Sequence, residues 1–214
     1  MSAPTGHDGL RARKKQRTRS ALVEAGLDLF LRHGYDATTV DEIAAAVEVS
    51  PRTFFRYFAG KEDIALAKGA ELDEQIVTAF LDAPAGEPPL PALRRAVLSM
   101  VRDSASTEGV PNFLRLQHLI NRTPSLLAGS LRRSSETQHR IAEEIGRRHG
   151  VDAARDLRPH VLVGVVFTGL HLGLEAMCAD PRRDLDRLVE LVGRAVDLAS
   201  AGVPDRWGDE PDSW

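Results

Sequence analysis

Apolar residues recur at intervals of three and four positions along almost the whole chain after residue 17, and no other feature restricts its fold as strongly. A helix with one buried face has this period, whereas a half-buried strand alternates with a period of two. Runs of alternating β-branched residues are almost missing from the 214 residues. The spacing therefore predicts an all-α protein of about nine helices.

Capping signals predict the bounds of the first two helices. A helix over residues 18–33 is expected to stop at Gly34, because glycine readily takes the left-handed conformation that ends many helices. Thr39 and Glu42 have the T-x-x-E spacing of a capping box, in which each side chain accepts a hydrogen bond from the other residue's N–H. A second, short helix is therefore expected directly after Thr39.

A third helix is expected to begin with Ser50 as its N-cap and Pro51 in its first turn, where a missing N–H costs nothing. It should end near residues 58–60. A proline-rich stretch over residues 83–91 cannot continue a helix and is predicted to be a loop. The remaining helices are expected at residues 61–81, 90–104, 111–121, 125–149, 152–179 and 183–201.

Composition excludes several classes of protein. Hydrophobic residues make up 43% and charged residues 28% of the chain, which permits a buried core. The longest strongly apolar stretch, residues 161–174, is shorter than the ~20 residues that a bilayer crossing needs. With no signal-like start either, we expect a cytoplasmic protein that does not enter membranes. The single cysteine, Cys178, allows no internal disulfide or cysteine-rich zinc site, and no cofactor is predicted.

The formal net charge of −3 hides an uneven distribution of charge. Residues 1–70 hold 11 basic and 9 acidic side chains, whereas residues 71–214 hold 17 and 22. Six of the basic residues fall within nine positions: Arg11, Arg13, Lys14, Lys15, Arg17 and Arg19. Such a run is either a solvated tail or an arm that contacts the phosphates or the minor groove of DNA.

The second and third helices, joined by a turn of about three residues, form a helix-turn-helix pattern, whose second helix enters the major groove of a duplex. Phe54 and Phe58 are four residues apart and are expected to pack inward. Four side chains then face outward: Arg52, Thr53, Phe55 and Arg56. Because arginine can hold guanine with two hydrogen bonds, Arg52 and Arg56 are the predicted base readers, and double-stranded DNA is the predicted partner. The alternative is that both arginines lie on the surface of an ordinary helical bundle.

Three motifs within residues 18–66 resemble the N-terminal DNA-binding domain of the TetR family of one-component repressors. They are A-x-x-L-F-x-x-x-G-Y in the first helix, with one extra residue before Phe30, T-T-V-x-x-I-A at residues 38–44, and V-S-x-x-T-F-F-x-Y-F-x-x-K-E-D at residues 49–63. The resemblance implies seven DNA contacts: Thr39 and Tyr57 to phosphate, Arg52, Thr53, Phe55 and Arg56 in the groove, and Lys61 to the backbone.

Elementary electrostatics supports two of these phosphate contacts. Thr39 and Lys61 stand at the N-termini of the second and fourth helices, where free N–H groups and the helix dipole attract anions. Tyr57 has an alternative role, because its ring could instead close the three-helix core.

One helix-turn-helix unit buries too little surface to select a single genomic site, so a homodimer is expected. The predicted interface is formed by the last two helices, as the resemblance also implies. Its candidate residues are an apolar stripe, Leu185, Leu188, Val189, Val192 and Val196, and three glycines that allow close approach, Gly164, Gly169 and Gly173. The alternative is that this stripe belongs to the core of one chain.

The resemblance further implies a pocket for a small effector among the middle helices. Six residues are candidates for its lining: Phe113, Leu116, His118, Asn121, Phe167 and His171. His171 also fits a satisfied histidine in an ordinary core. Two segments, VSPRTFFRYFAGKED and HLGLEAMC, resemble an actinobacterial subgroup that answers acyl-CoA-like ligands, which implies a long hydrophobic effector.

The expected organisation is a flexible basic arm (residues 1–17), a helix-turn-helix domain (18–66), an effector-binding and dimerisation domain (67–202) and a flexible tail (203–214). The expected function is that of a repressor that binds a pseudo-palindromic operator as a dimer and is released by a small hydrophobic effector. One alternative is a DNA-binding regulator without an effector. A helical enzyme or carrier is less favoured, because motifs such as G-x-S-x-G, H-E-x-x-H or a phosphate loop are missing from the sequence.

Overall fold

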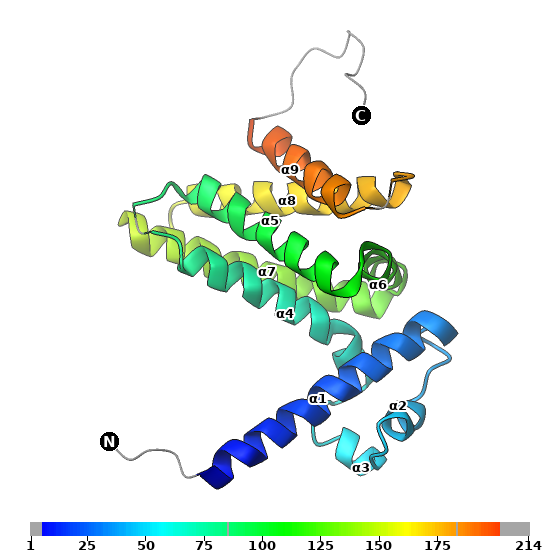
Figure 1. Ribbon diagram of the computed structural model, residues 1–214. Coiled ribbons are helices and arrows are strands. Elements are labelled where there is room, and N and C mark those ends of the chain that lie inside the picture. The colour runs from blue at the N-terminus through cyan, green and yellow to red at the C-terminus, as the bar shows by residue number, and fades with distance from the viewer. Residues whose placement is uncertain (1–5, 85, 183, 202–214) are drawn as a thin grey trace. The chain divides into compact units, whose positions relative to one another are not determined.

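The computed structural model describes residues 6–84, 86–182 and 184–201, and these residues form nine helices and no strand (Figure 1). The predicted all-α class is confirmed. In chain order the helices are α1 (Gly6–His33), α2 (Val40–Ala46), α3 (Pro51–Phe54), α4 (Lys61–Leu81), α5 (Pro89–Glu108), α6 (Val110–Arg122), α7 (Pro124–His149), α8 (Arg158–Ala179) and α9 (Leu185–Ala201).

The chain divides into two compact units. Within the described residues, the N-terminal unit extends to Glu74 and resumes over Asn112–Ser135. The C-terminal unit comprises Gln75–Pro111 and the chain from Glu136 onward. Helices α4 and α7 each contribute residues to both units.

One apolar cluster holds the N-terminal unit together. Residues from α1 to α4 form its centre, and each is at most 1% exposed: Leu22, Phe30, Ile43, Phe54 and Ile64. Leu116 and Ile120 of α6 and Leu126 of α7 belong to the same cluster. Helix α6 and the start of α7 therefore complete the core beneath the helix-turn-helix, which extends the unit well beyond residue 66.

Helix α1 departs most from the predicted bounds. It begins at Gly6 rather than near residue 18, so that most of the expected flexible arm is helical. Residues 10–17 consist only of Leu, Arg, Ala, Lys and Gln, all of which are good helix formers. This propensity outweighs the repulsion between neighbouring positive charges. The expected tail over residues 203–214 lies outside the described part of the chain.

Most other helices lie close to their expected positions, with α3 and α8 as the exceptions. Helix α3 ends at Phe54 rather than near residues 58–60, and residues 55–57 form a turn. Helix α8 begins at Arg158 rather than residue 152, and buried Pro159 occupies its first turn. Proline has no N–H and is tolerated there, whereas inside a helix it would break the ladder of hydrogen bonds.

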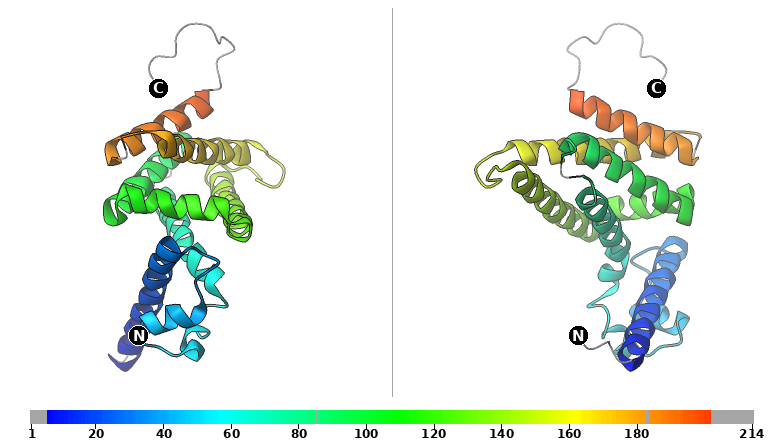
Figure 2. Two further views of the ribbon diagram at one scale, coloured as in Figure 1. Left: turned by 90° about the vertical axis from the view of Figure 1, so that its right-hand side faces the viewer. Right: turned by 60° about the vertical axis from the view of Figure 1, so that its left-hand side comes forward.

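In the C-terminal unit, α8 packs against α9, and α5 contacts both (Figure 2). A Cβ placed on Gly169 would lie 2.5 Å from the Cα of Val196, and one on Gly173 would lie 2.5 Å from the Cα of Val192. The two helices therefore approach so closely that only glycine fits at these positions.

This packing corrects part of the expected dimer interface. Leu188, Val192 and Val196 are fully buried within one chain. The stripe on α9 is thus mainly an intramolecular core, because its valines already fill the space above the glycines of α8.

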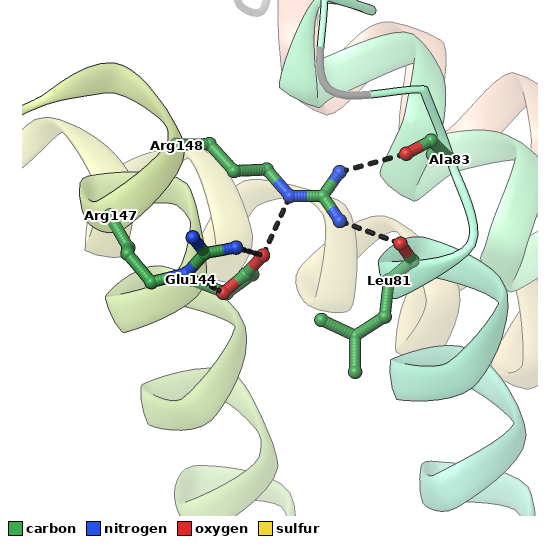
Figure 3. A network of polar contacts seen from close by, with 5 residues as sticks. All are labelled: Leu81, Ala83, Glu144, Arg147 and Arg148. Atoms are coloured by element: carbon green, nitrogen blue, oxygen red, sulfur yellow. Dashed lines mark hydrogen bonds and ion pairs between the residues drawn. The ribbon is translucent and has the colours of Figure 1, made fainter.

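An arginine connects the end of α7 to the end of α4 within the C-terminal unit (Figure 3). The Arg148 guanidinium donates hydrogen bonds to the backbone carbonyls of Leu81 and Ala83 at 2.7 and 3.1 Å. Its Nε donates to Glu144 at 2.7 Å, and the guanidinium lies 5.2 Å from the ring centroid of Phe80. Arg148 thereby satisfies two carbonyls at the α4 C-terminus that have no partner further along that helix.

By length and composition, α8 could cross a bilayer. The helix is longer than the apolar stretch of residues 161–174 because residues 158–160 and 175–179 are also helical. The interior helix of a globular protein passes the same test.

Candidate nucleic-acid interface

The capping box at the start of α2 is formed as predicted. The amide of Glu42 donates to the Thr39 hydroxyl at 3.2 Å, and the amide of Thr39 donates to the Glu42 carboxylate at 2.8 Å. The Thr39 hydroxyl in turn donates to the same carboxylate at 2.9 Å. These bonds lower the pKa of Glu42. A phosphate bound by the Thr39 hydroxyl would have to replace its bond to Glu42.

A tight turn sets α3 against α2. Glu48 takes the left-handed conformation with φ of 55°, and the amide of Val49 donates back to the carbonyl of Ala44 at 3.0 Å. The Ser50 hydroxyl then accepts a 3.1 Å hydrogen bond from the amide of Thr53, as its predicted role of N-cap requires. Four residues, 47–50, thus separate α2 from α3, close to the turn of about three residues that the helix-turn-helix pattern predicts.

The buried rings of α3 and the turn after it decide which side chains face outward. Phe54 is 0% and Phe58 5% exposed, and their ring centroids lie 5.8 Å apart. Phe55 is 57% exposed, and Arg52 and Arg56 are also exposed. The expected outward side is therefore present, but it is formed by α3 together with the turn after it.

Thr53 differs from its three neighbours on that side. It is half-buried, and its hydroxyl lies 3.1 Å from the hydroxyl of Ser50. A role in the groove would have to come from its methyl group or from a hydroxyl that gives up this contact.

Tyr57 packs against the core with its ring and keeps its hydroxyl within reach of Arg56. Its side chain packs partly against the apolar cluster, while its hydroxyl reaches the surface and accepts a 3.4 Å hydrogen bond from Arg56. The Arg56 guanidinium also lies 5.2 Å from the ring centroid. The hydrogen bond from Arg56 is the main cause that lowers the pKa of Tyr57, and Thr18 and Lys15 of α1 act in the same direction. Sequence reasoning did not place these two α1 residues beside Tyr57.

Lys61 is engaged in a way that the sequence does not suggest. Its ammonium donates to three backbone carbonyls, those of Tyr35 at 2.7 Å, Thr38 at 3.0 Å and Asp36 at 3.2 Å. An ammonium has three N–H groups, so these contacts use all of them. In this conformation Lys61 holds the loop between α1 and α2 and has no donor left for a phosphate.

The six candidate effector residues are divided between the units and differ in burial. Phe113 and Leu116 are buried in the N-terminal unit, where Leu116 is part of the apolar cluster, and Phe167 is buried in the C-terminal unit. Three polar candidates are exposed: His118, Asn121 and His171. The alternative role of His171 as a core histidine is therefore wrong, because its ring lies on the outer side of α8.

Comparisons with solved structures place the fold. The SmeT–triclosan complex superposes with a TM-score of 0.63 at 17% identity, covering 90% of this chain and all of SmeT. Thermus thermophilus FadR in complex with lauroyl-CoA gives a TM-score of 0.55 at 23% identity, covering 90% of this chain and 98% of FadR.

Comparisons of sequence are more specific. Residues 22–67 match the domain family described as "Bacterial regulatory proteins, tetR family", and residues 87–204 match the family described as "MftR C-terminal domain". The chain is 50% identical over 169 residues to the HTH-type transcriptional regulator TcmR of Streptomyces glaucescens, which covers 77% of this chain and 74% of TcmR. The chain therefore belongs to the TetR family of transcriptional regulators.

Proposed function

We propose that the protein is a cytoplasmic repressor that binds a pseudo-palindromic operator as a homodimer and is released by a small hydrophobic effector. The observation that carries the DNA-binding part is the outward face of α3. Arg52 and Arg56 are exposed on a segment held in place by the buried rings of Phe54 and Phe58. The buried rings fix the backbone that carries both arginines, and each guanidinium is exposed and can reach a base edge in the groove.

The backbone contacts of the operator are assigned to other groups. Thr39 and Tyr57 would bind phosphate on either side of α3, with Thr53 and Phe55 in the groove beside the arginines. Lys61 would act as a positioning residue, because its bonds to the loop before α2 hold Thr39 in place. This assignment replaces a direct phosphate contact with an indirect one.

The dimer part is supported by an apolar stripe on the outer side of α8. Val161 and Leu172, eleven residues or about three helical turns apart, are 62% and 52% exposed. Thr168 lies between them and is exposed as well, and Leu198 on α9 is 39% exposed. Large exposed side chains aligned on one helix are typical of a surface that another protein covers. A second copy of this chain would supply the second recognition helix that two half-sites require.

The proposal of a hydrophobic effector is supported by the ligands of two solved structures with a similar fold. One of them binds lauroyl-CoA, whose acyl chain is apolar, and another binds triclosan, which is a largely apolar molecule. An apolar effector would release the operator by favouring a dimer in which the two recognition helices no longer fit successive major grooves. Phe167, which is buried in the C-terminal unit, is the first of the six candidate contacts to substitute in a binding assay with acyl-CoA.

Selection of bound duplexes from random DNA tests the proposal. The wild-type protein should select a consensus with two-fold symmetry and half-sites about one helical turn apart, at a ratio of two chains per duplex. Arg52→Ala and Arg56→Ala should each relax preference at one base pair per half-site and cost about 1–3 kcal/mol on the selected operator. Equal losses on operator and random duplex would contradict base reading by α3, and an asymmetric consensus bound by one chain would contradict the dimer.

A further inference from the structure

Four positive side chains in the N-terminal part of α1 have no carboxylate partner in the part of the chain that the structure describes. Arg13, Lys14, Lys15 and Arg17 are exposed on this helix. Within the described residues, no carboxylate pairs with any of these four side chains. By contrast Arg19, the next basic residue, lies 3.9 Å from Glu71. The unpaired charges therefore begin where α1 passes beyond its contact with α4.

The helical period divides these four residues between two faces. At 100° per residue, Lys14 and Lys15 lie within about 60° of the direction of Thr18. Arg13 and Arg17 lie about 100° or more away from it, on a face where they line a shallow depression together with Gln16, Ser20, Ala21 and Glu24. Each face carries two of the four positive side chains, but the surroundings of the two faces differ.

The face of α1 that includes Thr18 lies beside Tyr57, in the turn after α3. The Thr18 side chain interacts with the Tyr57 hydroxyl, and the charge of Lys15 acts on the same group. One turn further along, the Arg19 guanidinium lies 5.2 Å from the ring centroid of Phe58. Figure 1 shows the N-terminal end of α1 continuing past α3. Lys14 and Lys15 thus extend the basic surface that Arg56 and Tyr57 begin.

Several positive groups so close together repel one another unless an anion lies between them. The groups that face Tyr57 are Lys15 from α1 and Arg56 from the turn after α3, both positive, and Thr18 of α1, which is neutral. A row of phosphates is an anion of matching shape, because it presents regularly spaced charges along one line.

We propose that the N-terminal part of α1 is a second DNA-binding element, in which Lys14 and Lys15 contact phosphates that flank each half-site. The inference rests on the operator binding proposed above and extends the contact beyond the recognition helix. At a rise of 1.5 Å per residue, residues 6–17 span about 18 Å, which equals about five base pairs of duplex. The contact is to the backbone and therefore adds affinity without adding base preference.

The test compares two charge-matched double variants of the full chain. Lys14→Gln/Lys15→Gln removes the proposed contacts, and Arg13→Gln/Arg17→Gln removes the same charge from the other face. Glutamine keeps a high helix propensity, so both variants should retain the helix, which circular dichroism checks. Each is titrated, between 50 and about 300 mM salt, with the selected operator on a long duplex and on one trimmed to the two half-sites.

We expect the lysine variant to bind the long duplex about 30-fold more weakly near 0.15 M salt, and its salt slope to fall by about two, as two lost phosphate contacts predict. The arginine variant should lose less than about 3-fold, since its side chains face away from Tyr57. On the trimmed duplex the lysine variant and the wild type should bind alike, and the selected consensus should be unchanged.

Equal losses in the two double variants, or a lysine variant that matches the wild type on the long duplex, would overturn the inference. Such a result leaves the proposed function intact if the wild type still selects a symmetric operator that Arg52→Ala weakens. A wild type that selects no duplex at all would instead contradict the proposed function itself.

Discussion

The ammonium of Lys61 lies 4.5 Å from the ring centroid of Tyr35 and donates a 2.7 Å hydrogen bond to the carbonyl of the same residue. Two residues separated by 26 positions thereby join the start of α4 to the loop before α2. The loop carries Thr39, the N-cap of α2, at its end. Lys61, which was expected to contact phosphate, thus holds the loop that positions Thr39, a proposed phosphate contact.

Lys61→Met should therefore lower stability and affinity without changing the number of phosphate contacts. Loss of the charged hydrogen bonds should reduce the free energy of unfolding by about 1–3 kcal/mol, measured by urea denaturation. Binding should weaken equally on operator and random duplex, while the slope of affinity against salt stays unchanged. A slope that falls by about one, with little loss of stability, would show that Lys61 contacts phosphate directly.

Gly169→Ala should destabilise the C-terminal unit. The added Cβ would lie 2.5 Å from the backbone of Val196, which cannot move without separating α8 from α9. We expect a loss of about 1–3 kcal/mol from this overpacking, measured by thermal or urea unfolding.

Gly164→Ala on the same helix is the matched control. Its Cβ would come no closer than 4.0 Å to any neighbour, so the change should stabilise the protein by roughly 0.5–1 kcal/mol through helix propensity alone. If both variants unfolded at the same denaturant concentration, the close approach of α8 and α9 would be wrong.

Because Arg148 binds Glu144, the free energy of unfolding should depend on pH in the acid range. Hydrogen bonds from Arg147 and Arg148 lower the pKa of Glu144 from 4.5 to about 2. Because the folded pKa is lower than the unfolded one, the carboxylate stabilises the protein above about pH 4.5, and this contribution is lost as the pH falls towards 2.

Glu144→Gln should consequently be less stable than the wild type at pH 7 and should lose less stability between pH 5 and 2.5. The measurement is the unfolding midpoint across that range. Glu143→Gln, at an exposed position on the same turn of α7, serves as the control and should follow the wild-type curve. Parallel pH profiles for Glu144→Gln and the wild type would contradict the role of this network.

Leu172→Asp should dissociate the proposed dimer. A carboxylate within the apolar stripe on α8 would have to be buried without a partner, which costs several kcal/mol in an interface. Sedimentation should then show a monomer that still binds duplex weakly, with a steeper dependence on protein concentration. Leu131→Asp places the same charge at a leucine on α7 that is 54% exposed, and this control should stay dimeric. A monomeric wild type at micromolar concentration would remove the basis of this prediction.

Local sequence signals located the helices and the candidate site with few errors. The capping box of Thr39 and the N-cap of Ser50 depend on bonds between residues three apart, so their spacing alone predicts them. The inward and outward sides of α3 follow from the same kind of spacing between Phe54 and Phe58. The helical start of α1 could also have been predicted, because residues 10–17 contain only good helix formers.

The tertiary structure decided which element packs against each apolar helix face. An apolar stripe shows that one side of a helix is covered, but not by which element. The sequence therefore predicts Leu116 in a pocket and Val196 in a dimer interface, whereas Leu116 packs in the N-terminal cluster and Val196 packs against α8. Lys61 likewise binds carbonyls 23 to 26 residues away, a separation over which no spacing rule applies. The chain by itself determined the helices, the turn and the family, because these depend on neighbours within four residues or on a motif. The folded protein determined which charges remain free for DNA, because each long side chain bonds to whichever groups the packing brings within its reach.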